Sequence, residues 1–197
     1  MKYEFEILAR ETCYQGFFRL HRCRVRHELY AGGTHEIQRE VFERGHAAAV
    51  VLYDPELDRL VMVEQFRIGA TGSAAGPWML EFVAGIIEEN EDAQAVATRE
   101  AVEEANCVIT DLIPINEFIL SPGGCTEHIY LYCGRVDASG AGGIYGLAAE
   151  GEDIRVVTVA GAAVAELLKS DSVASATTLI GLQWFLLNRE SVRDAWG

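Results

Sequence analysis

Alternating polar and apolar residues dominate the start of the chain. Residues 22–27 read RCRVRH, and the alternation resumes over residues 35–42. A period of two is typical of a strand whose two faces meet different surroundings. We therefore predict strands over residues 2–8, 15–30 and 35–42, which form a β-ribbon in a first region, residues 1–45.

Longer apolar runs follow within residues 46–197. AAAVVLYD (47–54) and RLVMVEQFR (59–67) flank a turn centred on Pro55, as in an antiparallel hairpin. Further strands are predicted over residues 78–84, 113–120, 128–136 and 153–159. The Gly/Ala-rich connection over 138–151 is long for a loop in a small domain, which favours a functional role.

Helical periodicity is expected in three places. Residues 85–107 contain a central helix with its entry loop, and residues 161–169 and 173–188 form a C-terminal helical hairpin. The last helix has an apolar stripe that is predicted to lie in the core: Leu179, Leu182, Phe185 and Leu186. Strands around one central helix place residues 46–197 in the α/β class, as a second domain.

Composition limits the class of protein. With 197 residues, 50% of them hydrophobic, the chain can bury a sizeable core. No run approaches the ~18 uncharged apolar residues of a transmembrane helix, and the opening MKYEFEILARE lacks the apolar region of a secretory signal. The five cysteines include no C-x-x-C pair, so we expect free thiols in a reducing compartment, the cytoplasm. A net charge of −14 argues against binding to nucleic acids or anionic membranes.

The predicted central helix carries an acidic face. At about 100° per residue, Glu100, Glu103 and Glu104 project from one side. The opposite side is predicted to be apolar and consists of Ala101, Val102 and Ala105. Carboxylates this close repel one another unless a cation lies among them, and a hard divalent ion with oxygen ligands, Mg²⁺ or Mn²⁺, is the natural occupant. The alternative is a solvated face with an ordinary i,i+4 ion pair between Arg99 and Glu103.

The spacing of the whole segment outweighs that alternative. From Gly85 to Glu104 the chain follows G-x5-E-x7-R-E-U-x-E-E, in which U is apolar and the first Glu is Glu91. This pattern resembles the signature of the Nudix hydrolases, which cleave nucleoside diphosphates linked to another group. Asn106 stands where the family has Gly. Since both residues tolerate the left-handed conformation, Asn106 is predicted to cap the C-terminus of the helix.

Further segments resemble the bacterial ADP-ribose pyrophosphatase family within this superfamily. They are RETCYQGFFRL, REVFERGHAAAVVL, VEQFRIGA, MLEFVAGIIEE, LSPGGCTE and GLAAEGEDIRV, with Pro122 about fifteen residues after the box. The resemblance implies a Nudix α/β/α sandwich, with mixed β-sheets around the Nudix helix and an N-terminal β-ribbon. It also implies Mg²⁺-dependent hydrolysis of ADP-ribose to AMP and ribose 5-phosphate, with Mn²⁺ as a possible substitute.

The resemblance implies a metal site. In that family the carbonyl matching Ala84 and the carboxylates matching Glu100 and Glu104 hold the Mg²⁺ ions, and the residue matching Glu103 assists. The net charge of −14 repels an anionic diphosphate. Bound ions and a few arginines must therefore supply positive charge locally.

The general base is implied to come from the loop segment AAEGED. Glu150 matches the family's base, and Glu152 is its neighbour; because the surrounding loop is less polar than in the family, either glutamate remains a candidate to take the proton. A carboxylate on a loop can close over the site once substrate and metal have gathered. His46 and His128 are interpreted as hydrogen-bonded structural histidines, because Mg²⁺ prefers oxygen.

Four residues are implied to contact the substrate. Phe17 and Arg39 match adenine-side contacts, and Arg67 and Glu127 match phosphate and ribose contacts. The alternatives are surface ion pairs for the arginines and a core position for Phe17. In the resembling enzymes the N-terminal ribbon exchanges between subunits, so we expect a homodimer in which Phe17 or Arg39 serves the partner's site.

Two other functions are weighed against this one. Another Nudix activity, such as hydrolysis of GDP-mannose, is an alternative because its enzymes share the segment SPGG-x-TE. A non-catalytic sensor of ADP-ribose is a second alternative. Degenerate sensors lose metal carboxylates, whereas Glu100, Glu103 and Glu104 are all present.

Overall fold

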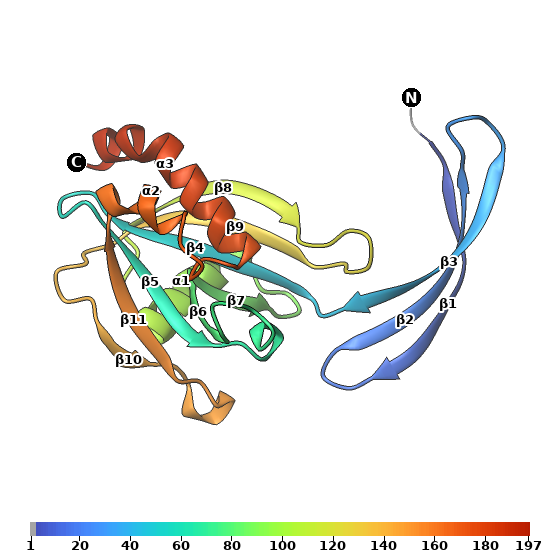
Figure 1. Ribbon diagram of the computed structural model, residues 1–197, viewed down its shortest axis with the longest axis horizontal. Coiled ribbons are helices and arrows are strands. Elements are labelled where there is room, and N and C mark those ends of the chain that lie inside the picture. Colours follow the sequence, from blue (N-terminus) through green and yellow to red (C-terminus); the bar gives the residue numbers. More distant parts are fainter. Residues whose placement is uncertain (1–2) are drawn as a thin grey trace. The chain divides into compact units, whose positions relative to one another are not determined.

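The computed structural model describes residues 3–197 and contains two compact units (Figure 1). The smaller unit consists of Met1–His46 and Ile119–His128, and the larger unit of Ala47–Phe118 and Ile129–Gly197. Each unit has eight Lys and Arg residues, whereas 22 of the 30 Asp and Glu residues lie in the larger unit. The larger unit therefore carries the whole net charge of −14.

The smaller unit is built on a three-stranded antiparallel sheet of order β1-β2-β3. Its strands are β1 (Phe5–Gln15), β2 (Arg19–Glu28) and β3 (Thr34–Glu43). The predicted first strand was too short, and its residue 2 lies outside the described residues. The predicted second strand began too early. Gly16 N–H donates to Phe18 O at 2.9 Å and closes the turn between β1 and β2.

Backbone hydrogen bonds of two antiparallel pairings hold this sheet together, and ion pairs between its strands add to them. Arg26 on β2 contacts Glu36 on β3 at 2.6 Å and Glu6 on β1 at 3.3 Å. Such cross-strand pairs stabilise antiparallel sheets by small increments. The segment 119–128 joins the end of β3 through a hydrogen bond from Phe42 N–H to Gly124 O (2.8 Å).

The larger unit contains most of an eight-stranded mixed sheet of order β10-β11-β5-β4-β9-β8, with β6 on β5 and β7 on β4. Its strands are β4 (His46–Asp54), β5 (Arg59–Phe66), β6 (Trp78–Glu81), β7 (Val83–Ile87), β8 (Asp111–Ile119), β9 (His128–Arg135), β10 (Gly143–Tyr145) and β11 (Ile154–Ala160). The pair β4–β9 is parallel, whereas β4–β5 is antiparallel, which confirms the predicted hairpin.

Helices cover both faces of this sheet (Figure 1). They are α1 (Ala93–Ala105), α2 (Val164–Leu167) and α3 (Ala176–Trp196), with short 3-10 turns η1 (Ile68–Ala70), η2 (Ala148–Glu150) and η3 (Gly161–Ala163). Successive residues of β4 point to opposite faces: Val50 packs in the core cluster of α1, and Val51 in that of α3. The α/β/α sandwich is thus confirmed. None of the described helices is long and apolar enough to span a bilayer.

Helix α3 is longer than its sequence pattern predicts. It continues to Trp196 because its last turns are anchored on the β4–β5 turn. Arg189 pairs with Asp58, and Arg193 Nε donates to Pro55 O at 3.1 Å. Leu182 and Phe185 are fully buried, as predicted. Leu186 is 38% exposed and lies outside the core, so its assignment was wrong.

Candidate active site

Local capping fixes the ends of α1. The Asp92 carboxylate accepts hydrogen bonds from the N–H groups of Gln94 and Ala95, each at 3.1 Å, and forms the N-cap. At the other end, Asn106 adopts φ 52° and ψ 35°, and Cys107 N–H donates to Ala101 O at 2.9 Å. The left-handed C-cap predicted for Asn106 is therefore confirmed.

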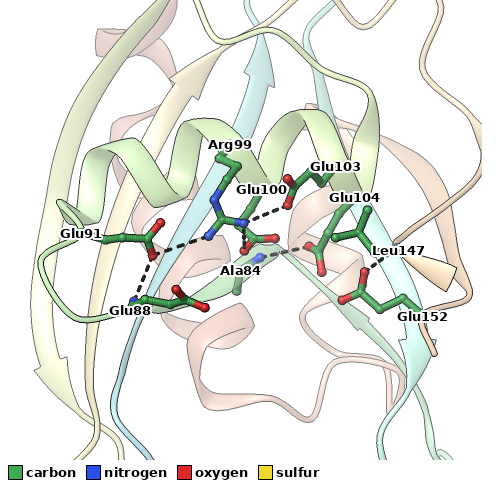
Figure 2. A network of polar contacts seen from close by, with 9 residues as sticks. All are labelled: Ala84, Glu88, Glu91, Arg99, Glu100, Glu103, Glu104, Leu147 and Glu152. Atoms are coloured by element: carbon green, nitrogen blue, oxygen red, sulfur yellow. Dashed lines mark hydrogen bonds and ion pairs between the residues drawn. The ribbon is translucent and has the colours of Figure 1, made fainter. Parts of the chain in front are cut away.

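The acidic face of α1 lies against β7 (Figure 2). Ala84 N–H donates to Glu104 Oε2 at 3.1 Å. A Cβ added to Gly85 would overlap the Glu100 carboxyl group, so glycine at this position leaves room for that side chain as it lies here. Val102 is 46% exposed rather than part of an apolar face, because the helix is buried through Ala101 and Ala105.

Arg99 ties the acidic residues together. Its Nη1 lies 2.8 Å from both Glu100 Oε1 and Glu103 Oε2, and its Nη2 lies 3.7 Å from Glu91 Oε2. Glu91 in turn accepts the N–H of Glu88 at 2.9 Å (Figure 2). The i,i+4 pair between Arg99 and Glu103 is thus present, but it is part of a larger network. This network orients the carboxylates towards one another, unlike the separate, solvated side chains of an ordinary helix surface.

Burial perturbs two of these carboxyl groups. Glu104 is 2% exposed, and burial raises its pKa to about 8, opposed by the Ala84 hydrogen bond and reinforced by the charge of Glu100. Burial also raises the pKa of Glu100, and the neighbouring Arg99 charge opposes that rise. Carboxyl groups with raised pKa values, facing one another in a partly buried place, are typical of functional sites.

The loop before β11 adds a further carboxylate. Figure 2 shows Glu152 next to Glu104, and the charge of Glu152 raises the pKa values of Glu100 and Glu104. Leu147 N–H donates to Glu152 Oε2 at 2.8 Å and holds it in place. Glu150 ends the turn η2 and is exposed. We call Glu100, Glu103, Glu104 and Glu152 the acidic cluster.

Arg67 is the cation predicted to meet the substrate phosphates, and it lies at the end of β5. Its Nε donates to Glu81 Oε2 at 2.7 Å, and its charge lowers the pKa of Glu104. Sequence reasoning missed Glu81. The available signal was a carboxylate between Leu80 and Phe82, three residues before Ala84 in an otherwise apolar segment.

The other predicted substrate residues belong to the smaller unit. Phe17 is 87% exposed on the β1–β2 turn, which rules out the core alternative for this residue. Arg39 lies on β3 and donates to Gln38 O at 2.8 Å. Glu127 is buried, which raises its pKa, and it lies 3.4 Å from Arg44 Nε. Their contacts with a substrate stay predictions.

The two histidines weighed in the sequence analysis, His46 and His128, contact each other. His46 Nδ1 accepts the backbone N–H of His128 at 3.1 Å, and the two rings meet edge to face with centroids 5.1 Å apart. This is the hydrogen-bonded structural role interpreted from the sequence.

The donor set suits a hard divalent cation. Over residues 3–197, no three His, Cys, Asp or Glu side chains already converge as ligands of one ion. The carboxylates of Glu100, Glu104 and Glu152 nevertheless gather beside the backbone of Ala84, and every candidate donor is oxygen. A cation among them would offset both the burial, which is the main cause of the raised pKa of Glu104, and the smaller repulsion from neighbouring carboxylates. The residues therefore fit Mg²⁺ or Mn²⁺.

Comparisons with known proteins found a family model, similar sequences and a similar structure. The family model of the NUDIX domain matches residues 43–176. The ADP-ribose pyrophosphatase of Escherichia coli is 44% identical over 99% of this chain and 94% of its own length, and that of Haemophilus influenzae is 40% identical over 98% and 91%. A GDP-mannose pyrophosphatase of Enterobacter sp. is 29% identical over 77% of the chain and 78% of its own length.

A solved structure of an ADP compounds hydrolase superposes with a TM-score of 0.74 over 96% of this chain and 97% of its own chain. Its sequence is 19% identical, so it bears on the fold alone.

Proposed function

Because this chain belongs to the NUDIX domain family, we propose that it is a hydrolase that converts ADP-ribose to AMP and ribose 5-phosphate. The observation that carries the proposal is the acidic cluster, in which Glu100, Glu104 and Glu152 meet beside Ala84. The similarity to ADP-ribose pyrophosphatases along nearly the whole chain supports the choice of substrate. The carboxylates that a non-catalytic sensor would lose are intact, which argues for catalysis.

Mg²⁺, with Mn²⁺ as a substitute, is the proposed cofactor. The Ala84 carbonyl and the carboxylates of Glu100, Glu104 and Glu152 would hold it. Glu103, whose carboxylate contacts Arg99, would assist. When bound, such an ion neutralises diphosphate charge and lowers the pKa of a water molecule.

Hydrolysis requires one proton to leave the attacking water. The water oxygen forms a new bond to one phosphorus of the diphosphate while the bridging P–O bond breaks, which leaves a phosphate monoester on each product. A glutamate of the loop before β11 accepts the water proton. We propose Glu150 as this base, because its side chain is exposed to solvent, whereas Leu147 N–H holds Glu152 in the acidic cluster.

The remaining residues bind and orient the substrate. Arg67 contacts the diphosphate through its guanidinium group, which suits bidentate contact with phosphate oxygens. Phe17 stacks on the adenine, and Arg39 and Glu127 contact the adenine and ribose sides. We further propose a homodimer that works in the cytoplasm, which the five free thiols support.

Turnover of ADP-ribose, GDP-mannose and NADH by the purified protein with Mg²⁺ tests the substrate. We expect kcat/KM for ADP-ribose to exceed the other two by at least about tenfold, a difference of about 1.4 kcal/mol in transition-state binding. AMP and ribose 5-phosphate are the expected products by chromatography. A protein for which ADP-ribose is the poorest of the three substrates would not have the proposed function.

Calorimetric titration with Mg²⁺ and Mn²⁺ at neutral pH tests the cofactor. Glu104→Gln is expected to weaken binding and to lower turnover by several decades, because the ion supplies most of the charge stabilisation. If the variant keeps its turnover at ordinary Mg²⁺ concentrations, Glu104 is not part of the metal site.

A further inference from the structure

We propose that Glu81 is a positioning residue that holds Arg67 ready for the diphosphate and away from the acidic cluster. The inference rests on the proposed function, because it assigns Arg67 to the phosphate groups of the same substrate. No feature of the Nudix segment itself requires Glu81, which lies before that segment on β6.

The contact between the two side chains is specific and anchored at both ends. Arg67 Nε donates to Glu81 Oε2 at 2.7 Å. The Glu81 side chain is only 15% exposed, whereas that of Arg67 is 44% exposed. The backbone N–H of Arg67 also donates to Pro77 O at 2.7 Å. The carboxylate is therefore a fixed point, and the guanidinium group extends from it towards solvent.

The contact with Glu81 leaves the two terminal nitrogens of the Arg67 guanidinium group available for the substrate. Nε is the one nitrogen of Arg67 that pairs with a carboxylate in the described residues. Both terminal nitrogens remain for the phosphate oxygens, in the planar fork that matches them. An arginine side chain that is free in solution samples many rotamers. Holding it in one orientation before binding lowers the cost of ordering it on the substrate.

Glu81 has a second effect, because Arg67 has competing partners. The pairing of β11 with β5 ends at Arg155 opposite Glu64, and Glu152 and Arg67 each lie three residues beyond that last pair. The charge of Arg67 also acts on the Glu104 carboxyl group. Without Glu81, the guanidinium group would move to Glu152 or Glu104. It would then occupy the oxygens that the divalent cation needs.

The same sheet offers a matched control pair. Arg155 on β11 contacts Glu64 on β5 at 2.7 Å, the same distance as the pair of interest, and Glu64 points away from the core cluster of α1. Removing the Glu64 charge breaks an ion pair of the same type on the same strand without affecting Arg67. Exposed pairs of this kind contribute little to stability.

Steady-state kinetics and binding of a nonhydrolysable α,β-methylene analogue of ADP-ribose test the proposal. We expect Glu81→Gln to raise KM and the analogue Kd about tenfold, to raise the Mg²⁺ concentration for half-maximal rate severalfold, and to change kcat less than about threefold. Glu64→Gln is expected to stay within about twofold of wild type in every constant. The double variant Arg67→Ala, Glu81→Gln should have the same KM and analogue Kd as Arg67→Ala alone, because Glu81 acts through Arg67.

Three results would overturn it. The first is that Glu81→Gln matches Glu64→Gln in all constants. The second is that the loss of substrate affinity in Glu81→Gln multiplies with the loss in Arg67→Ala when the two changes are combined. The third is that a lower melting temperature of Glu81→Gln accounts for its whole loss of substrate affinity. Wild-type hydrolysis of ADP-ribose is measured first. Failure at that step removes the proposed function, whereas an active wild type with an unaffected Glu81→Gln variant removes only the role of Glu81.

Discussion

At the scale of single residues, the buried carboxyl group of Glu104 has the clearest physical consequence. An ordinary glutamate has a pKa of about 4.3 in an unfolded chain. Burial raises the pKa of Glu104 to about 8 in the folded protein. Between these values the metal-free folded state holds a proton that the unfolded state has released. Folding and protonation of this residue are therefore linked.

The linkage predicts a pH dependence of stability. Because the folded state binds the extra proton, the contribution of Glu104 to stability is greatest below about pH 4.3 and is lost as the pH rises towards about 8. Urea denaturation of chelator-treated protein between pH 5 and pH 8 measures this loss. Glu104→Gln removes the titrating group and should flatten the profile. Parallel profiles for wild type and variant would contradict the assignment.

Two variants of the loop before β11 separate the general base from the metal donor. Glu150→Gln is expected to lower kcat by about 10²–10⁴, the usual scale for a general base, with little change in KM or in Mg²⁺ affinity. Glu152→Gln is expected to weaken Mg²⁺ binding instead, because Glu152 lies in the acidic cluster. Steady-state kinetics and metal titration of both variants show which glutamate is the general base and which binds the metal. If Glu152→Gln removes the pH-dependent step and leaves metal affinity intact, the base is Glu152.

Residue positions fixed by helix geometry could be predicted, and those fixed by loop geometry could not. Glu100 and Glu104 are one turn apart on α1, so their shared face follows from spacing alone. The position of Glu152 depends on Gly146, whose φ is 104° and where any Cβ would lie 2.6 Å from Glu152 Cβ. The pairing of Arg67 with Glu81 depends on how β6 aligns with β5, which local patterns do not specify.

At the scale of elements, the caps of α1 set the position of the acidic cluster. Asp92 starts the helix and Asn106 ends it, and both act through local hydrogen bonds or backbone conformation. A residue other than glycine with a φ of 52° is strained unless it is Asn or Asp. The stability of α1 therefore depends on the identity of residue 106.

Substitutions at position 106 test this dependence. Asn106→Ala is expected to lower the free energy of unfolding by about 1 kcal/mol, because alanine resists the left-handed conformation. Asn106→Gly, which restores the family residue, should leave it unchanged or raise it by up to about 1 kcal/mol. Urea denaturation with an unchanged m-value measures both. Equal stability of all three proteins would mean that the cap contributes nothing.

Elements with a strong periodic pattern were predicted well, and those set by tertiary contacts were not. The hairpin of β4 and β5 follows from two apolar runs around a turn. The predicted single strand over 78–84 is instead two strands, because β6 pairs with β5 whereas β7 pairs with β4. Strand β10 is three residues long and exists through its pairing with β11. The predicted helix over 161–169 shortens to η3 and the four residues of α2.

At the scale of the whole molecule, the open sheet β1-β2-β3 calls for a covering surface. Strands β1 and β3 are mostly exposed along their length, with Phe5, Ile7 and Tyr14 of β1 all at least half exposed. A sheet of this kind exposes apolar side chains and unpaired edges, both of which favour association. This supports the predicted homodimer.

Complementation between two variants with impaired sites tests whether the dimer shares its sites. Arg39→Ala and Glu104→Gln change different units of the chain. If Arg39 serves the partner's site, mixed dimers contain one intact site, and an equimolar mixture should recover about one quarter of the wild-type sites in a cyclic dimer. Glu100→Gln mixed with Glu104→Gln should recover nothing. A monomer in sedimentation at micromolar concentration would refute the arrangement.

The anchoring of α3 on the β4–β5 turn makes the last turns of this helix part of the folded larger unit. A truncation before Arg189 would leave the Asp58 carboxylate, which also accepts the Tyr53 hydroxyl at 2.9 Å, without its guanidinium partner. Exopeptidase digestion of the native protein should therefore slow once it reaches Arg193, whose side chain is tied to Pro55 O. Shortened versions of the protein should keep residues up to that point if they are to retain their native melting temperature.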